Sequence, residues 1–425
     1  MRGASGDLGA PPPADPATPG EPLGPGQGAA PAPAELLDHY RAGTSFFFAS
    51  PRGSMLARGV DAQVPKTTAG GRAALPRQVA EFLRGAEEFG RVDPVVVGAV
   101  PFAENLPAHL VLPSSVHRAG PLTERVGAPS PPELEYQLRQ VPAPAEYERA
   151  VERVLKRLRD GGLTKVVLAR SLELSTSAPI DPAGVLRNLA GADPGGYTFA
   201  VDLPRRGEEG SGQRAEHART LLGASPELLV SRRGTRVRAN PLAGSRPRSA
   251  DPVEDRRRAE ELLRSAKDLR EHAAVVEAVV AGLSPLTREL VVPEHPSVIS
   301  TAAMWHLSTD ITGELADPAT SSLELAAAMH PTPAVCGTPP EAARVAIAEA
   351  EPFERGFYTG MVGWCDAAGD GEWVVTIRCA EIEGPSLRFY AGAGIVEGSV
   401  PADELAETSA KFRTALSAMG WADAL

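Results

Sequence analysis

The sequence predicts a mixed α/β fold built around a large mixed sheet rather than a doubly wound one. Runs rich in β-branched and aromatic residues alternate with turn residues, and helical patterns lie among them. Strands and helices do not follow each other in the regular order that a doubly wound sheet requires. At 425 residues the chain is long for an average domain, but a large single α/β unit reaches this size.

The beginning of the chain differs from the rest in composition. Residues 1–34 are almost entirely Pro, Ala, Gly and small polar residues, without an aromatic side chain. Such a segment has too little apolar surface to offset the entropy that it would lose on ordering. We therefore expect a disordered tail over residues 1–34 and a single catalytic domain over residues 35–425.

Three helices are expected within the domain. Apolar spacing predicts a helix over residues 145–162, where two glycines mark its end, and a linker precedes it over residues 127–145. The same spacing predicts one long helix over residues 253–283 and a final helix over residues 402–419.

Strand-like runs make up much of the remaining chain. A polar insertion over residues 204–219 is expected to be an exposed loop, and residues 221–239 are expected to form a hairpin. The other strand-like runs are residues 45–51, 95–102, 109–116, 164–174, 198–203, 372–384 and 386–396.

Charge and cysteine content exclude several classes of protein. The chain has 43 basic and 54 acidic residues, a net charge of −11, and no long basic run, so nucleic acid and anionic membranes are poor partners. The first residues have no apolar run, and the most hydrophobic helical stretch is short and carries Glu277, so we expect neither a secretion signal nor a membrane span. The widely spaced Cys336, Cys365 and Cys379 form no zinc motif, which favours a reducing cytoplasm.

Two pairs of acidic residues, far apart in sequence, each lie within a predicted helix. They are Asp268 with Glu271 and Glu404 with Glu407. Their spacing places both carboxylates of a pair on one helix face. Two such faces brought together would offer the oxygen ligands that Mg²⁺ prefers, although each pair alone also suits a solvated helix face.

Lys165 and Glu227 are candidates for proton transfer. Strand alternation places Lys165 on the same apolar face as Val167 and Ala169, where desolvation favours a general base; a lysine extending to the sheet edge is the alternative. Glu227 follows a Gly-Ala-Ser-Pro turn into a hydrophobic strand. There it would either stay protonated as a general acid or cap the turn.

Glycine-rich segments predict sites of close approach to a ligand. Gly244 and Ser245 lie in a tight turn whose N–H groups could hold an anion. Glycines 392, 394 and 398 do not have the spacing of a dinucleotide-binding motif. Close approach of the backbone to a ligand carboxylate explains them better.

Three further side chains could bind carboxylates. Arg378, expected on a strand, has the planar fork for bidentate binding, and Tyr358 could add a hydroxyl donor. Lys411 could act similarly, or form a surface pair with the acid four residues before it. His306 and His330 are expected in the core or in turns rather than as metal ligands.

Taken in order, these motifs resemble the chorismate-utilising enzymes, and most closely the isochorismate synthases. The resemblance extends from about residue 36 to residue 420. The first half, with SFFFASPRGSMLARGV and VVVGAVPFAENLPAHLVLP, looks like the siderophore type rather than the menaquinone type. The remaining segments that carry it are TKVVLARS, LLGASPELLV, NPLAGSRPRS, AKDLREHAAVV, HLSTDITGEL, MHPTPAVCGTP, ERGFYTGMVGW, GEWVVTIRCAEI and AGAGIVEGSVPADELAETSAKF.

The resemblance implies a fold and a reaction. The fold is one large unit with two related halves, each a sheet backed by helices, and the active site between them. The reaction is the Mg²⁺-dependent conversion of chorismate to isochorismate, an isomerase activity. By this resemblance Lys165 is the base that activates water for attack at C2, and Glu227 is the acid that protonates the departing C4 hydroxyl.

The same resemblance assigns the ligands of the metal and the substrate. Glu271 and Glu407 correspond to direct Mg²⁺ ligands, and Asp268 and Glu404 to residues that act through metal-bound water. The metal would bind the ring carboxylate of chorismate. The residues that would hold the substrate are Gly244, Ser245, Ala334, Tyr358, Arg378, Gly392 and Lys411.

Two positions favour isochorismate synthase over other members. By the resemblance, members of the family that use ammonia typically have glutamine at the position of Lys165. Lysine at this position therefore indicates water as the nucleophile. Salicylate synthases, the main alternative, tend to carry threonine where this chain has Ala334. A menaquinone-pathway isochorismate synthase remains a further alternative, since it performs the same reaction. The resemblance also implies a monomer without an amidotransferase subunit.

Overall fold

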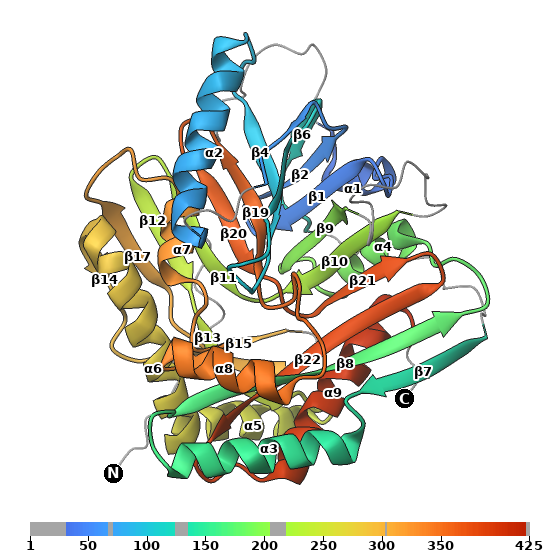
Figure 1. Ribbon diagram of the computed structural model, residues 1–425, viewed down its shortest axis with the longest axis vertical. Coiled ribbons are helices and arrows are strands. Elements are labelled where there is room, and N and C mark those ends of the chain that lie inside the picture. Colours follow the sequence, from blue (N-terminus) through green and yellow to red (C-terminus); the bar gives the residue numbers. More distant parts are fainter. Residues whose placement is uncertain (1–30, 67–70, 124–134, 205–217, 302–303, 422–425) are drawn as a thin grey trace. The chain divides into compact units, whose positions relative to one another are not determined.

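Two large sheets pack face to face and form the framework of the chain (Figure 1). The computed structural model describes residues 31–66, 71–123, 135–204, 218–301 and 304–421, which all belong to one unit, Pro31–Leu425. The expected α/β fold is present, but the single large mixed sheet is not. Within the described residues there are two large sheets and a small one, and their strands pair antiparallel.

The first sheet has ten strands, the second nine and the small sheet three. In spatial order the first sheet contains β18 (Gly337–Thr338), β8 (Lys165–Thr176), β22 (Ser386–Val396), β21 (Cys379–Glu383), β10 (Arg219–Ser225), β9 (Tyr197–Leu203), β1 (Ser45–Ser50), β2 (Gly53–Arg58) and β6 (Ser115–Ala119), with β7 (Tyr136–Val141) paired to β8. The second contains β14 (Thr287–Val291), β17 (Ile311–Leu315), β12 (Arg236–Asn240), β11 (Leu228–Arg233), β20 (Gly371–Val375), β19 (Met361–Asp366), β4 (Val95–Val100), β5 (His109–Leu112) and β3 (Ala62–Gln63). The small sheet contains β13 (Leu242–Pro247), β16 (Met304–Ser308) and β15 (Ser297–Ser300).

Helices cover the outer faces of the large sheets. α2, α6 and α7 pack on the second sheet, while α1, α3, α4, α8 and α9 pack on the first (Figure 1). The helices are α1 (Pro33–Asp38), α2 (Gly71–Glu88), α3 (Pro144–Arg159), α4 (Pro182–Ala192), α5 (Pro252–Arg264), α6 (Ala266–Leu283), α7 (Ser322–Met329), α8 (Pro340–Ala350) and α9 (Pro401–Met419), with a 3₁₀ turn at Ser284–Leu286.

The core follows the two-residue period of the strands. Phe48 and Phe199 of the first sheet pack with Val97 and Val374 of the second in the layer between the sheets. Phe47, one residue before Phe48, points to the opposite face and packs under the helices. Each fully buried side chain of this kind contributes about 1.5–3 kcal/mol. Both faces of both sheets are therefore held in place.

Two of the places where the chain crosses between the large sheets lie next to each other. Strand β10 of the first sheet continues through Glu227 into β11 of the second, and β20 of the second continues through Arg378 into β21 of the first. Ala224 N–H donates to the carbonyl of Arg378, and Val375 N–H to that of Glu227. The expected hairpin over residues 221–239 is thus only partly correct. β11 and β12 form a hairpin, while β10 pairs with β9 and β21.

The long helix expected over residues 253–283 is two helices. Ser265 leaves the helical conformation, with φ −73° and ψ 106°, and its hydroxyl caps α6 by accepting from the N–H of Asp268. Serine is favoured at such caps because it satisfies a backbone donor that has no partner within the helix. The break places Asp268 in the first turn of α6.

Other expectations about the elements have mixed outcomes. The helix near residues 145–162 and the final helix are confirmed as α3 and α9. The expected linker over residues 127–145 contains β7, which pairs with β8, and α2 was not predicted. The expected tail lies outside the described residues up to residue 30, but its last two residues begin α1. Most of the insertion at residues 204–219 also lies outside them.

No helix in the described ranges combines the length and the apolar character needed to cross a membrane.

Candidate active site

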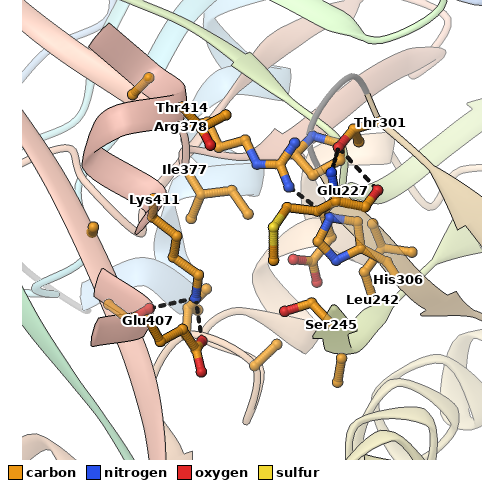
Figure 2. A pocket seen from close by; sticks show the side chains of 18 of the residues that line it. Glu227, Leu242, Ser245, Thr301, His306, Ile377, Arg378, Glu407, Lys411 and Thr414 are labelled. Carbon is orange, nitrogen blue, oxygen red and sulfur yellow. Dashed lines mark hydrogen bonds and ion pairs between the residues drawn. The ribbon is translucent and has the colours of Figure 1, made fainter. Parts of the chain in front are cut away.

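A cavity of about 240 Å³ lies where the end of the first sheet meets the small sheet, α6 and α9. The predicted site residues that line it are Glu227, Gly244, Ser245, Asp268, Glu271, Ala334, Tyr358, Arg378, Gly392, Glu404, Glu407 and Lys411. Figure 2 shows Glu407 and Lys411 on one side of this cavity and Glu227, Arg378 and His306 on the other. The fold therefore brings together side chains that are nearly two hundred positions apart in the sequence.

The acidic pairs occupy one end of the cavity, which we call the helix end: Asp268 and Glu271 on α6, and Glu404 and Glu407 on α9. The sequence predicted that the members of each pair share one helix face, and both pairs line this cavity. Burial raises the pKa of Glu404. Burial also acts to raise the pKa of Glu407, but the nearby Lys411 outweighs it and the pKa of Glu407 lies below its ordinary value.

Three acids of the helix end are paired with basic side chains. Lys165 Nζ lies 2.7 Å from Glu271 Oε1, and Lys411 Nζ lies 2.7 Å from Glu407 Oε1. Arg246 Nη2 lies 2.7 Å from Asp268 Oδ2. Arg246 lines the cavity and was not predicted as a site residue. These pairs offset much of the charge that four clustered carboxylates would otherwise concentrate.

Lys165 is the first residue of β8 and is 5% exposed. It lies on the same strand face as Val167, as strand alternation predicted. Gly394 of β22 lies opposite: a Cβ there would be 2.9 Å from Glu271 Oε1 and 3.1 Å from Lys165 Cε. Any larger residue at Gly394 would displace the ion pair between Lys165 and Glu271.

Glu227 lies at the opposite end of the cavity, which we call the crossover end: Glu227, Arg378 and His306. It is 3% exposed, and burial raises its pKa to about 8. The backbone of Leu242 and the charge of Lys165 act in the other direction but are weaker. Glu227 is therefore protonated at neutral pH and is able to donate a proton into the cavity.

Arg378 differs from its sequence prediction. It lies in the turn before β21 rather than on a strand, with φ +49°, a conformation uncommon outside glycine. Its Nη2 donates to Nε2 of His306 at 2.6 Å, which makes Nε2 the acceptor and leaves the ring proton on Nδ1 (Figure 2). Burial lowers the pKa of Arg378 to about 10, so the guanidinium stays charged at neutral pH.

His306 was expected in the core or in a turn, but it lines the cavity. Burial is the main cause that lowers its pKa well below the ordinary value, with the charge of Arg378 adding to the effect. The ring is therefore neutral at neutral pH. It orients the guanidinium of Arg378 without competing for an anion.

A second wall is built around Gly392. A Cβ on this residue would be 2.9 Å from Tyr358 Oη, so glycine is required for close approach. The carbonyl of Gly392 accepts from Lys411 Nζ at 2.7 Å. The ring of Tyr358 stacks on Tyr390 at 4.8 Å between centroids. This packing fixes the Tyr358 hydroxyl beside the backbone of β22.

The small sheet supplies the wall opposite β22. Gly244 has φ +76°, and the pairing of β13 with β16 shifts register between Ala243 and Ser245. A Cβ on Gly244 would lie 3.0 Å from Cβ of Asp268. The bulge thus turns the backbone of Gly244 and the side chain of Ser245 toward the cavity.

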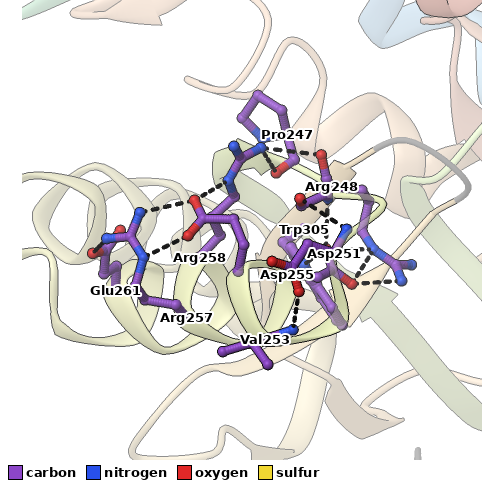
Figure 3. A network of polar contacts seen from close by, with 11 residues as sticks. Pro247, Arg248, Asp251, Val253, Asp255, Arg257, Arg258, Glu261 and Trp305 are labelled. Carbon is purple, nitrogen blue, oxygen red and sulfur yellow. Dashed lines mark hydrogen bonds and ion pairs between the residues drawn. The ribbon is translucent and has the colours of Figure 1, made fainter.

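A polar network fixes this small sheet to α5 (Figure 3). Asp255 of α5 accepts hydrogen bonds from Arg248 Nε and from Trp305 Nε1, at 2.9 Å for the indole. The Arg248 guanidinium lies over the Trp305 ring at 4.5 Å from its centroid. Arg258 donates to the carbonyl of Pro247 at 3.1 Å. These contacts hold β13 and β16 against α5. This wall of the cavity is therefore rigid.

The donor chemistry of the helix end fits a hard divalent cation, because all four acids offer carboxylate oxygen. In the described part of the chain, no group of three or more His, Cys, Asp or Glu side chains lies close enough together to hold a metal ion. Three of the four acids are ion-paired instead. A cation that binds here has to compete with these pairs.

Sequence reasoning missed several residues of the cavity. Lys267 is the second residue of α6, and its position beside Asp268 could have indicated it. Asp193, Thr301 and Met304 carry no motif of their own, and only the fold places them at the cavity. Arg246, in the segment AGSRPRS, could have been found as a basic residue next to the predicted anion turn.

Comparison with known proteins agrees with this geometry. A family model described as "Chorismate binding enzyme" matches residues 117–420. The isochorismate synthase DhbC of Bacillus subtilis (strain 168) is 56% identical over 387 residues, 91% of this chain and 96% of that protein. The vibriobactin-specific isochorismate synthase of Vibrio cholerae is 43% identical over 388 residues, 91% of this chain and 94% of that protein.

A solved structure shares the fold closely. The crystal structure of DhbC from Bacillus anthracis has a TM-score of 0.85 and 52% sequence identity, covering 91% of this chain and 99% of that one. The chain belongs to the chorismate-binding enzyme family. Within that family it is similar to the isochorismate synthases, so the family and the fold predicted from the sequence are confirmed.

Proposed function

We propose that the chain converts chorismate reversibly to isochorismate, with water as the nucleophile at C2 and loss of the C4 hydroxyl. The observation that supports this proposal is that Glu227 lines the cavity, while Lys165 lies 2.7 Å from Glu271, which also lines it. Lys165 is buried at the helix end, and Glu227 is kept protonated at the crossover end. Addition of water with loss of a hydroxyl needs one group to accept a proton and another to donate one.

The proposed roles are those that the resemblance in sequence assigns. Lys165 would take a proton from water as its oxygen attacks C2. Glu227 would give its proton to the C4 oxygen, so that the group leaves as water rather than as hydroxide. Arg378, Lys411 and Tyr358 would hold the two carboxylates of chorismate, aided by backbone and hydroxyl donors of Gly244 and Ser245.

The proposal includes Mg²⁺ at the helix end. Glu271 and Glu407 would bind the ion directly, and Asp268 and Glu404 would act through water. When bound, the ion would neutralise the ring carboxylate of chorismate and hold it in place. What supports this is that four carboxylates from two helices line the same cavity, together with the acidic net charge, which would otherwise repel a dianionic substrate.

The proposed pathway is the synthesis of 2,3-dihydroxybenzoate for a siderophore. Its support is the similarity to DhbC and to the vibriobactin-specific enzyme over nearly their full length. We propose that the chain acts in the cytoplasm, as a monomer and without an amidotransferase subunit. Three free, buried cysteines suit a reducing compartment.

Product analysis tests the function directly. The purified chain alone is incubated with chorismate and Mg²⁺, and the products are separated. The proposal expects isochorismate as the main product, with loss of activity when the metal is chelated. Salicylate and pyruvate as main products would assign the chain to the salicylate synthases. Consumption of chorismate only when ammonia is added would contradict water as the nucleophile.

A further inference from the structure

A buried arginine–glutamate pair lies beside the cavity, in the segment between α8 and β19. The side chains of Arg355 and Glu351 are 2% and 3% exposed, and Arg355 Nη2 lies 2.5 Å from Glu351 Oε1. A buried ion pair is a weak source of stability, because removing two charges from water costs about as much as the pair gains. Stability alone therefore does not explain the pair.

The guanidinium of Arg355 uses all five of its N–H donors. Nε and one N–H of Nη2 bind the two oxygens of Glu351. The other three donate to the carbonyl of Val335 at 2.8 Å, the hydroxyl of Thr359 at 3.2 Å and the carbonyl of Val167 at 2.7 Å. Only a planar guanidinium has this number and arrangement of donors.

The acceptors belong to three separate parts of the cavity. Val167 lies on β8, two residues after the proposed base. Val335 follows Ala334, and both residues line the cavity. Thr359 follows Tyr358 and has φ +58°, a strained conformation for a β-branched residue. The guanidinium thus adds side-chain contacts to the backbone pairing of β8 with β18, in which Val167 N–H donates to the carbonyl of Cys336 at 2.8 Å, and it links both segments to Thr359.

Glu351 and two aromatic rings complete the arrangement. The N–H of Ala169 donates to Glu351 Oε1 at 2.8 Å, which fixes β8 a second time. The guanidinium carbon of Arg355 lies 5.8 Å from the ring centroid of Tyr358 and 4.7 Å from that of Phe102. The ring that presents the Tyr358 hydroxyl to the cavity therefore also packs on this cation.

We infer that Arg355 is a positioning residue, which sets the separation between the strand that carries Lys165 and the wall that carries Ala334 and Tyr358. This inference rests on the proposed function. Arg355 touches neither the acids of the helix end nor Glu227. Its loss should therefore lower the rate of the chemical step while leaving Mg²⁺ binding unchanged.

The variant R355K tests the inference. Lysine keeps the charge but lacks the fork that joins Val167 with Val335. We expect kcat to fall about 100-fold, the effect of displacing reacting groups by about 1 Å. The half-saturating Mg²⁺ concentration and the calorimetric affinity for chorismate should stay close to the parental values. A folded R355K protein with parental kcat and KM would overturn the inference.

Arg232 provides a matched control. Its side chain is 5% exposed, and its guanidinium donates to the carbonyls of Ala368 and Pro318 at 2.6 and 2.7 Å, in turns next to the second sheet. None of the three residues lines the cavity. R232K should lower the melting temperature as R355K does, but leave kcat unchanged. An equal fall of kcat in both variants would show that R355K acts only through stability, and would overturn the inference.

E351Q decides the question if R355K does not fold. Glutamine keeps an acceptor for Ala169 N–H but removes the ion pair that holds Arg355. We expect kcat to fall about tenfold with Mg²⁺ binding unchanged, and parental kcat in folded E351Q would reject the inference. These outcomes are distinct from failure of the proposed function, which would show as no isochorismate from the parental protein itself.

Discussion

Glu407 at the helix end of the cavity and Glu227 at the crossover end have pKa values shifted in opposite directions. At the helix end, Glu407 is paired with Lys411 at 2.7 Å, and its pKa lies below the ordinary value. At the crossover end, Glu227 has a single charged residue, Lys165, acting on it from a distance, and burial raises its pKa to about 8. One glutamate is an anion at neutral pH and the other is an acid.

The difference arises from the backbone elements. Glu407 lies on α9, where the residue four positions later is a lysine on the same helix face. Glu227 lies where the chain leaves one sheet for the other, a place enclosed by apolar layers on both sides. On the helix, the residue four positions later carries the opposite charge, which lowers the pKa of Glu407. At the crossover between the sheets, burial removes water from Glu227 and raises its pKa. The fold thus keeps one glutamate charged and another protonated, as the proposed metal binding and proton donation require.

The largest effect is expected for K165A. Removal of the base should lower kcat about 1,000-fold, since general-base catalysis contributes about 100- to 10,000-fold. Chorismate binding, measured by calorimetry with Mg²⁺ present, should persist. Lys156, exposed on α3, gives the control K156A with parental turnover. Parental turnover by K165A would show that Lys165 is not the base. The two ends of the cavity would then differ only in how they bind the substrate and the metal.

The next effect is expected for E227Q. Glutamine has similar size but no acidic proton, so kcat should fall about 100-fold. The parental enzyme should lose activity as the pH rises through about 8, because Glu227 is protonated below that value. In E227Q this alkaline limb should be absent from the pH profile of the residual activity. An unchanged limb would assign it to another group.

The raised pKa of Glu227 also predicts how the stability of the protein depends on pH. The folded pKa of Glu227 is raised above its value in the unfolded chain, so the stability that it contributes is present below about pH 4.5 and is lost as the pH rises through about 8. The melting temperature of the parental protein should therefore fall over this range more than that of E227Q. Equal slopes in the two proteins would contradict a protonated, buried Glu227.

At the helix end, E407Q should act mainly on the metal. The amide loses the negative charge, so the half-saturating Mg²⁺ concentration should rise at least about tenfold. E277Q, at an exposed position of α6, is the control and should titrate as the parental protein does. A parental Mg²⁺ titration for E407Q would remove Glu407 from the metal site.

The smallest effect is expected for A334T. The wall gains a methyl and a hydroxyl group next to Val335, which should reduce the rate of isochorismate formation by about tenfold or less. By the resemblance in sequence, salicylate synthases tend to carry threonine at this position. A trace of pyruvate should therefore appear among the products of A334T. Pyruvate can be measured by a coupled dehydrogenase assay. Its complete absence would show that this residue alone does not separate the two activities.

Local pattern predicted the parts of the site that depend on local structure. The acidic pairs on α6 and α9, Lys165 on β8 and the close approach at Gly392 follow from helical and strand periodicity and from the size of glycine. The broad α/β class followed in the same way. Antiparallel pairing in two large sheets did not, because β10 and β11 are adjacent in sequence yet belong to different sheets.

The residues that sequence reasoning misplaced depend on these long-range crossings. Arg378 was expected on a strand because its neighbours are β-branched, but it occupies the turn between β20 and β21. His306 lies in an ordinary strand sequence, and only the pairing of β13 with β16 places it beside Arg378. Arg355 has a local partner in Glu351, four residues before it, but its contacts with the carbonyls of Val335 and Val167 join distant segments and were not predicted.

The most direct test of the account is the origin of the C2 oxygen. The protein is incubated with chorismate and Mg²⁺ in ¹⁸O-labelled water, and early product is analysed by mass spectrometry. If Lys165 activates water and Glu227 expels the C4 hydroxyl, each isochorismate molecule should carry the label at C2. Unlabelled isochorismate would mean that the hydroxyl group moves within the substrate, and would contradict the division of roles between the two ends of the cavity.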